Sequence, residues 1–89
     1  MANYVLVRSK VRDFSEWKAE YDNHLPSRDA AQLSEKYLLR STEDQNEVVI
    51  LFEAADMDKA KAFTASDDLR EAMQKSGVVD KPDIYFLND

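Results

Sequence analysis

The 89-residue sequence predicts one α+β domain with the element order strand, helix, strand, strand, helix, strand. Three observations support this prediction: two short continuous apolar runs typical of buried strands, two amphipathic stripes with helical spacing, and a cluster of turn residues between two strand patterns. The length fits a single domain over residues 1–89 with one core. We therefore expect a four-stranded antiparallel sheet with helices on one side.

The first element is predicted to be a strand over Asn3–Val11. It is rich in valine, and its length fits a strand better than a helix. Within it, Tyr4–Val7 is continuously apolar, which predicts burial on both faces of the sheet.

A helix is predicted next, from Phe14 to His24 or Leu25. Asp13 and Glu16 form an Asp-x-x-Glu capping box at its start, and Pro26 follows its end. Apolar and aromatic residues spaced by three and four predict the side that faces the core: Phe14, Trp17, Tyr21, His24 and Leu25.

The middle of the chain predicts an antiparallel hairpin. Pro26–Leu33 can begin another helical turn, because proline suits the first helical position. Ser34–Thr42 then reads as a mixed strand, Glu43–Asn46 as a turn, and Glu47–Ala54 as a strand that is continuously apolar from Val48 to Phe52. About four turn residues between two strands favour a hairpin.

The C-terminal third predicts a broken helical region and a last strand. Asp56 caps the first helical piece, and the helix breaks near Ala65, where Ser66 can cap a second piece. Gly77, the only glycine, suits the helix C-terminus. Asp83–Leu87 forms a short terminal strand.

This order of elements is that of the ferredoxin-like, or split βαβ, arrangement, in which the first and third strands are central and both crossovers are right-handed. Its helices cover one face only, while residues alternate between the two faces. If Val5, Val7, Val49 and Leu51 share one face, the uncovered face carries Tyr4, Leu6, Val48, Ile50 and Phe52. We expect a homodimer through those five residues, since such a patch exceeds what monomers usually expose. The alternative is a monomer whose patch is covered by its own termini or by a different protein.

Composition excludes several function classes. The net charge of −6, with scattered acidic residues, argues against nucleic acid as a partner. The lack of cysteine and the single histidine exclude the usual metal-ligand spacings, and one glycine cannot build a phosphate-binding loop. No apolar run is long enough for a membrane span, and the start does not resemble a secretory signal. We expect a cytoplasmic protein with no cofactor.

Several short motifs along the whole chain carry a family resemblance: Val7–Val11 with Asp13, Phe14 and Trp17-Lys18; Asn46–Val49 with Phe52-Glu53; Ser66-x-Asp68-Leu69 with Met73; and Gly77-Val78 with Pro82–Tyr85. On these residues the chain resembles the dimeric α+β barrel superfamily, and within it small proteins related to antibiotic-biosynthesis monooxygenases and often labelled cyclase-like. The chain departs from that pattern at Ser9, where relatives often have histidine, and at Gln32, where they often have glycine.

The resemblance implies a small-molecule pocket between the helices and the sheet. Five residues are candidates to line it: Trp17, Tyr21, His24 and Arg28 from the first helical region and Tyr37 from the second strand. Together they would bind a planar, oxygen-rich organic molecule, with His24 as the catalytic proton-transfer group.

Each candidate also has a structural interpretation. Trp17 and Tyr21 fit a helix core, His24 fits a capping or surface position, and Arg28 fits an ion pair with Asp29 or Glu35. Arg8 and Arg40 suit ion pairs between subunits or contacts at the interface rim.

Two functions follow from these interpretations. The first is a small-molecule binding protein of the monooxygenase-like or cyclase-like group, whose catalysis would be cofactor-independent. The second is a non-enzymatic homodimeric module with a structural or protein-interaction role. A ligand pocket of about 300 Å³ or more favours the first.

Overall fold

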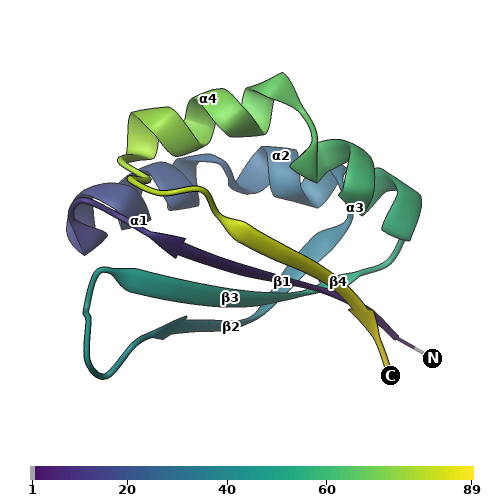
Figure 1. Cartoon of the computed structure of the whole chain (residues 1–89). Helices are drawn as coiled ribbons and strands as arrows, with labels where there is room; N and C mark the ends of the chain where they lie inside the picture. Colours follow the sequence, from purple (N-terminus) through teal and green to yellow (C-terminus); the bar gives the residue numbers. More distant parts are fainter. Residues whose placement is uncertain (1) are drawn as a thin grey trace.

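The computed structural model, which describes residues 2–89, contains one four-stranded sheet with four helices on one face (Figure 1). The elements in chain order are β1 (Asn3–Lys10), α1 (Phe14–Asn23), α2 (Leu25–Ala30), β2 (Leu33–Arg40), β3 (Glu47–Ala54), α3 (Met57–Thr64), α4 (Asp67–Ser76) and β4 (Asp83–Asn88). The strand order is β2-β3-β1-β4, and all neighbours are antiparallel. The predicted fold class is confirmed, with the two continuously apolar strands at the centre.

The predicted helix N-cap residues and Gly77 are confirmed, whereas the Glu16 carboxylate of the expected capping box pairs with Arg12. The side chains of Asp13, Asp56 and Ser66 accept hydrogen bonds from backbone N–H groups in the first turns of α1, α3 and α4. Gly77 ends α4 with φ +90°, a left-handed conformation that glycine adopts without strain. These local signals explain why the helical region after β3 breaks into two pieces.

The segment between α1 and β2 contains a short second helix. His24 ends α1 and precedes α2, whose early proline is Pro26. After α2, Gln32 has a positive φ of 59°. Its N–H donates to the Asp29 carbonyl at 3.0 Å, and its carbonyl accepts from the Ala55 N–H at 3.1 Å. The tight turn into β2 therefore holds an ordinary residue in a conformation that favours glycine.

The sequence assignment of the two sheet faces was wrong for β3. Val5 pairs with Phe52 and Val7 pairs with Ile50, so these residues share the face beneath the helices. Val48, Ile50 and Phe52 are 1%, 4% and 5% exposed and belong to the core. They cannot form the expected dimer interface, whereas Tyr4 and Leu6 do lie on the uncovered face. Alternation within β1 and within β3 was correct, but the register between the two strands decides which sets share a face.

The uncovered face of the sheet is nevertheless apolar. Its apolar side chains are partly exposed on the central strands and strongly exposed on the edge strands. We call this set of residues the open face: Tyr4, Leu6, Val49, Leu51, Tyr37, Leu39, Tyr85 and Leu87. Tyr37, Leu39, Tyr85 and Leu87 are 61%, 53%, 52% and 44% exposed. Exposure of this many large apolar side chains on one face is unusual for a monomer.

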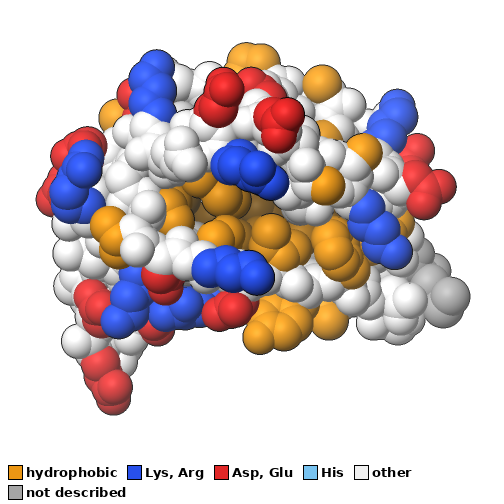
Figure 2. Space-filling view, turned by 45° about the horizontal axis from the view of Figure 1, so that its top comes forward, with side chains coloured by type: hydrophobic (Ala, Val, Ile, Leu, Met, Phe, Trp, Pro, Cys, Tyr) orange, Lys and Arg blue, Asp and Glu red, His pale blue; other side chains and the backbone are white. Residues whose placement is uncertain are grey.

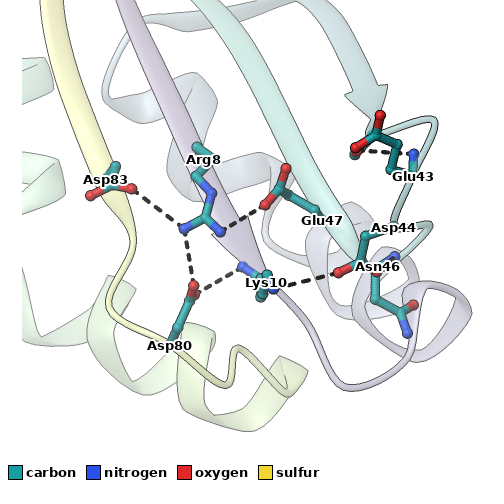
Figure 3. Close-up of polar contacts among 9 residues, drawn as sticks. Arg8, Lys10, Glu43, Asp44, Asn46, Glu47, Asp80 and Asp83 are labelled. Carbon is teal, nitrogen blue, oxygen red and sulfur yellow. Dashed lines mark hydrogen bonds and ion pairs between the residues drawn. The ribbon is translucent and has the colours of Figure 1, made fainter.

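Charged residues gather at one end of the open face (Figure 3). The Arg8 guanidinium lies 2.8 Å from the Glu47 carboxylate, 3.0 Å from that of Asp80 and 3.4 Å from that of Asp83. The hydrogen bond to Glu47 is the main cause of a raised pKa for Arg8. Arg40 instead lies over the Phe14 ring, 3.8 Å from its centroid. Both arginines thus have partners within the chain.

Within residues 2–89, no helix is both long enough and apolar enough to cross a membrane.

Candidate functional site

A hollow lies between the helical layer and the sheet, as Figure 2 shows. Its inner cavity has a volume of about 70 Å³. The floor comes from the helix-facing side of the sheet and the roof from α3 and α4, with mostly apolar lining: Val5, Val7, Leu33, Ile50, Phe52, Phe63, Leu69 and Met73. Six residues with polar side chains interrupt that lining: Ser9, Glu20, His24, Arg28, Thr64 and Ser76.

The inner cavity continues into an outer groove beside β4. The groove has a volume of about 340 Å³ and shares five lining residues with the cavity: Thr64, Leu69, Met73, Val78 and Ile84. The charged residues Arg70, Asp80 and Lys81 also line the groove. Basic side chains are visible around the mouth of the hollow in Figure 2. The hollow therefore has a small apolar interior and a wider, partly basic entrance.

Trp17 and Tyr21 form a stacked pair on the inner side of α1. Their ring centroids lie 4.8 Å apart at an interplanar angle of 22°. The Tyr21 hydroxyl donates a hydrogen bond of 2.8 Å to the Glu35 carboxylate. Burial and this hydrogen bond raise the pKa of the Tyr21 phenol, because both favour its protonated form. Tyr21 therefore keeps its proton at neutral pH and acts as a donor to Glu35.

Arg28 is buried against this aromatic pair. The residue is 6% exposed, and its guanidinium carbon lies 3.7 Å from the centroid of the Tyr21 ring. Its Nη1 donates to the Tyr21 backbone carbonyl at 2.7 Å. The alternative pairing with Asp29 or Glu35 is not formed, because Glu35 accepts from Tyr21 and no ion pair of Arg28 is found in the described part of the chain.

His24 lies where α1 and α2 meet and contributes to the lining of the cavity. Its side chain is 18% exposed, and its Nε2 lies 3.1 Å from a carboxylate oxygen of Asp68 in the first turn of α4. The imidazole also lies beside Phe63, with ring centroids 5.8 Å apart. An Nε2–H donated to Asp68 would leave Nδ1 as the basic nitrogen, the arrangement that suits a proton acceptor.

Four of the five predicted pocket residues come together and one does not. Trp17, Tyr21, His24 and Arg28 all line the cavity, whereas Tyr37 lies on the open face. A bulge between Glu35 and Tyr37 is the reason, because one extra residue reverses the alternation of β2. Leu25, expected in the core stripe of the first helix, is 48% exposed because α1 ends before it.

Four residues of this region were not among the predicted pocket residues: Ser9, Glu35, Asp68 and Ser76. Ser9 was noted only as a departure from the family pattern, and Glu35 only as a possible partner of Arg28. Ser9 is 4% exposed, and its spacing of two from Val5 and Val7 was the available signal for its inward position. No comparable signal existed for Asp68, whose contact with His24 joins residues 44 positions apart. Among residues 2–89, no group of three acidic, histidine or cysteine side chains is placed to hold a metal ion.

Solved structures share this fold over nearly the whole chain. One is named as a candidate antibiotic biosynthesis monooxygenase from Caulobacter crescentus CB15, with 20% identity, a TM-score of 0.74, and coverage of 99% of this chain and 89% of that one. Another, with the same description, from Bordetella bronchiseptica, has 16% identity, a TM-score of 0.78, and coverage of 99% and 96%. Rv0793 from Mycobacterium tuberculosis has 15% identity, a TM-score of 0.69, and coverage of 100% and 95%.

No family model matches the sequence, and no curated protein matches it significantly. The solved structures nevertheless confirm, at the level of the fold, the resemblance inferred from short motifs. Because chemistry diverges readily within one fold, the function has to be argued from the hollow itself.

Proposed function

We propose that this protein is a homodimer that binds a small aromatic or polyketide-like molecule in the hollow between its helices and its sheet. The observation that carries the proposal is the convergence of His24 and Arg28 on a mainly apolar cavity walled by Trp17 and Tyr21. A few placed polar groups in an apolar cavity are typical of small-molecule sites. The names of the structural neighbours support the monooxygenase-like group.

The size of the hollow bears on both functions that the sequence left open. The inner cavity of about 70 Å³ is too small for a typical ligand, which favours the non-enzymatic module. The outer groove of about 340 Å³ reaches the usual size of a ligand site. Since cavity and groove share lining residues, we propose that the ligand occupies both, with only one end inside the cavity.

Ligand binding can be tested by filling the cavity. Ala72 on α4 lines it, so Ala72→Met should remove the binding of hydroxylated aromatic compounds that shift the indole resonance of Trp17. The matched control is Ala62→Met, which makes the same change at an exposed position on α3. If no compound of the panel shifts Trp17 in the unmodified protein, the binding proposal fails and the module remains.

We assign proton transfer in this hollow to His24, positioned by Asp68. An imidazole that hydrogen bonds to a carboxylate through one nitrogen is oriented to accept a proton at the other. Oxygen uptake with a bound hydroxylated aromatic is the assay, since any oxidation here is proposed to be cofactor-independent. His24→Gln should lower the rate of oxygen uptake and change the affinity for the hydroxylated aromatic compound by less than about threefold. Absence of uptake by the unmodified protein would refute catalysis but not binding.

The open face supports the dimer. A dimer interface of standard size buries about 1,600 Å², roughly half of it apolar, which is worth about 20 kcal/mol. That exceeds an association cost of about 4–15 kcal/mol. A second copy covering the open face would place the two sheets face to face, as the sequence predicted, although the residues of β3 that it contacts would be Val49 and Leu51.

Leu51 is the position to test, because it pairs with Leu6 on one side and Tyr37 on the other. Leu51→Lys would place two uncompensated charges at the centre of the dimer, raising its Kd by at least about a hundredfold. Leu25→Lys is the matched control, since Leu25 is 48% exposed on the helical side. Light scattering should give twice the chain mass of 10.3 kDa for the unmodified protein and the control. A monomeric unmodified protein would refute the dimer.

A further inference from the structure

We propose that the ligand of the hollow is an organic monocarboxylate whose carboxylate binds the guanidinium of Arg28 and whose apolar body extends along the cavity into the outer groove. This inference rests on the proposed binding function and adds the chemical class of the ligand. Three features of the hollow lead to it: a buried cation without a counter-ion, hydrogen-bond donors that are still available, and a lining that suits only one negative charge.

The first feature is the burial of Arg28 without an acidic partner. The residue is 6% exposed, yet none of the ion pairs found within residues 2–89 includes it. Removing an arginine from water is costly unless an anion compensates for the lost hydration. The Tyr21 ring and carbonyl compensate in part, but neither carries a negative charge. The folded chain thus holds a positive charge that a ligand anion would neutralise.

The second feature is the set of donors that Arg28 still offers. A guanidinium has five N–H donors, and Nη1 uses one for the Tyr21 carbonyl. In the described residues, every side-chain nitrogen or oxygen that is fully buried has a hydrogen-bond partner. The donor nitrogens of Arg28 that have no partner must therefore border accessible space. Arg28 lines the cavity, which makes that space the natural place for an acceptor. The planar fork of a guanidinium matches the two oxygens of a carboxylate.

The third feature is the shape and polarity around Arg28. About 70 Å³ accommodates a carboxylate and the first carbons attached to it, whereas the rest of the molecule would lie in the groove of about 340 Å³. Beyond Arg28 the walls are mainly apolar and hold no second arginine or lysine, and Glu20 also lines the cavity, so the lining disfavours a second negative charge. Phosphate monoesters and dicarboxylates fit this environment poorly. A single carboxylate on an apolar body fits it well.

The entrance also suits an anion, although the whole chain carries a charge of −6. Arg70 and Lys81 line the outer groove, and the Lys61 ammonium lies 5.5 Å from the centroid of the Phe86 ring. The acidic lining residue Asp80 pairs with Arg8 at 3.0 Å. Figure 2 shows lysine and arginine side chains around the mouth of the hollow. Local positive charge at a cleft attracts anions even when the net charge is negative.

A matched pair of probes separates the charge from the shape of the ligand. Benzoate and benzamide have nearly the same size and planarity, but only benzoate is an anion at pH 7. Trp17 is the only tryptophan and is 5% exposed beside Tyr21, so its indole resonance reports on the cavity. In an NMR titration we expect benzoate to bind at least about tenfold more tightly than benzamide, as a charge-assisted hydrogen bond predicts.

Variants then assign that preference to Arg28. Arg28→Gln should lower the affinity for benzoate at least about tenfold and change the affinity for benzamide by less than about threefold. Arg28→Lys keeps the charge without the planar fork and should retain part of the preference, which keeps the test valid if Arg28→Gln does not fold. The control is Arg12→Gln, because Arg12 has a side chain 62% exposed and lies outside the cavity lining. It should leave both affinities unchanged.

The outcomes distinguish the inference from the function on which it rests. Equal affinity for benzoate and benzamide, or a preference that persists in Arg28→Gln, overturns the carboxylate inference while supporting small-molecule binding. If neither probe shifts Trp17, and the hydroxylated aromatics do not shift it either, the binding function itself is overturned. Binding of both probes to Arg28→Gln with unchanged affinity would place the ligand away from Arg28 and also overturn the inference.

Discussion

Replacing Gln32 by glycine tests whether the turn beside the hollow stores backbone strain. A left-handed conformation costs a residue with a side chain about 1–2 kcal/mol, and Gln32 has a φ of 59°. Both backbone hydrogen bonds of Gln32 remain possible after the change, and its exposed side chain loses little contact. The greater conformational freedom of glycine in the unfolded chain offsets about 0.5–1 kcal/mol of the stability gained by relieving the strain. The net expectation is a gain of about 0.5–1 kcal/mol in the free energy of unfolding.

Thermal unfolding followed by circular dichroism measures this gain. For a domain of this size, about 0.5–1 kcal/mol corresponds to a rise in Tm of about 2–8 °C. Protein concentration must be held constant, because dimerisation would also contribute to Tm. The control is Gln32→Ala, which removes the same side chain without relieving the strain and should change stability by less than about 0.5 kcal/mol. If Gln32→Gly is no more stable than Gln32→Ala, the strain argument is wrong.

Two further predictions concern local interactions. The raised pKa of Tyr21 means that the unfolded chain loses this phenolic proton at a lower pH than the folded chain does. Its contribution to stability should therefore be complete below about pH 10 and fall as pH rises further. Urea denaturation at pH 8 and pH 10.5 should show a larger loss for the unmodified protein than for Tyr21→Phe, and equal losses would contradict the assignment. Asp13→Ala should lower the free energy of unfolding by about 1 kcal/mol through loss of the α1 cap. Asp13→Asn can still accept a hydrogen bond from the Glu16 N–H and should lower it much less. Equal losses for the two variants in urea denaturation would argue against the cap.

The sequence was a reliable guide to the elements and their ends. Glu47–Ala54 was predicted with the bounds that β3 has, and the break between α3 and α4 was placed where Ser66 caps the second piece. Both depend on the side chains of residues that are near each other in the chain. The split βαβ topology followed from the order of elements and the position of the most apolar strands.

The faces of the sheet were harder to predict, although the sequence contains a usable signal. The residues that alternate with Val49 and Leu51 towards the ends of β3 include Glu47 and Glu53 on the same face, while Val48 begins a wholly apolar set. Charged residues at both ends of an alternating set mark the side nearer to water. The apolar positions alone cannot separate the two sets, because both alternating sets of β3 contain them.

The sequence predicted the helical residues of the candidate site but not the side chains with which they form hydrogen bonds. Trp17, Tyr21 and His24 follow the spacing of one helix, so they line one side of it regardless of the remaining fold. Arg28 joins them because α2 follows α1 after a single residue. The roles of these side chains depend on contacts with distant segments. Glu35 accepts the hydrogen bond of Tyr21, and Asp68 pairs with His24.

By itself the sequence determined the elements, their order and caps, and an apolar excess that one helical layer cannot cover, because these depend on local spacing and composition. Only the tertiary structure decided which residues form the open face, why Tyr37 lies there, and that Arg28 is buried without an acidic partner. The physical reason is the same in each case. Strand register, a one-residue bulge and the environment of a buried charge all depend on segments far apart in the chain.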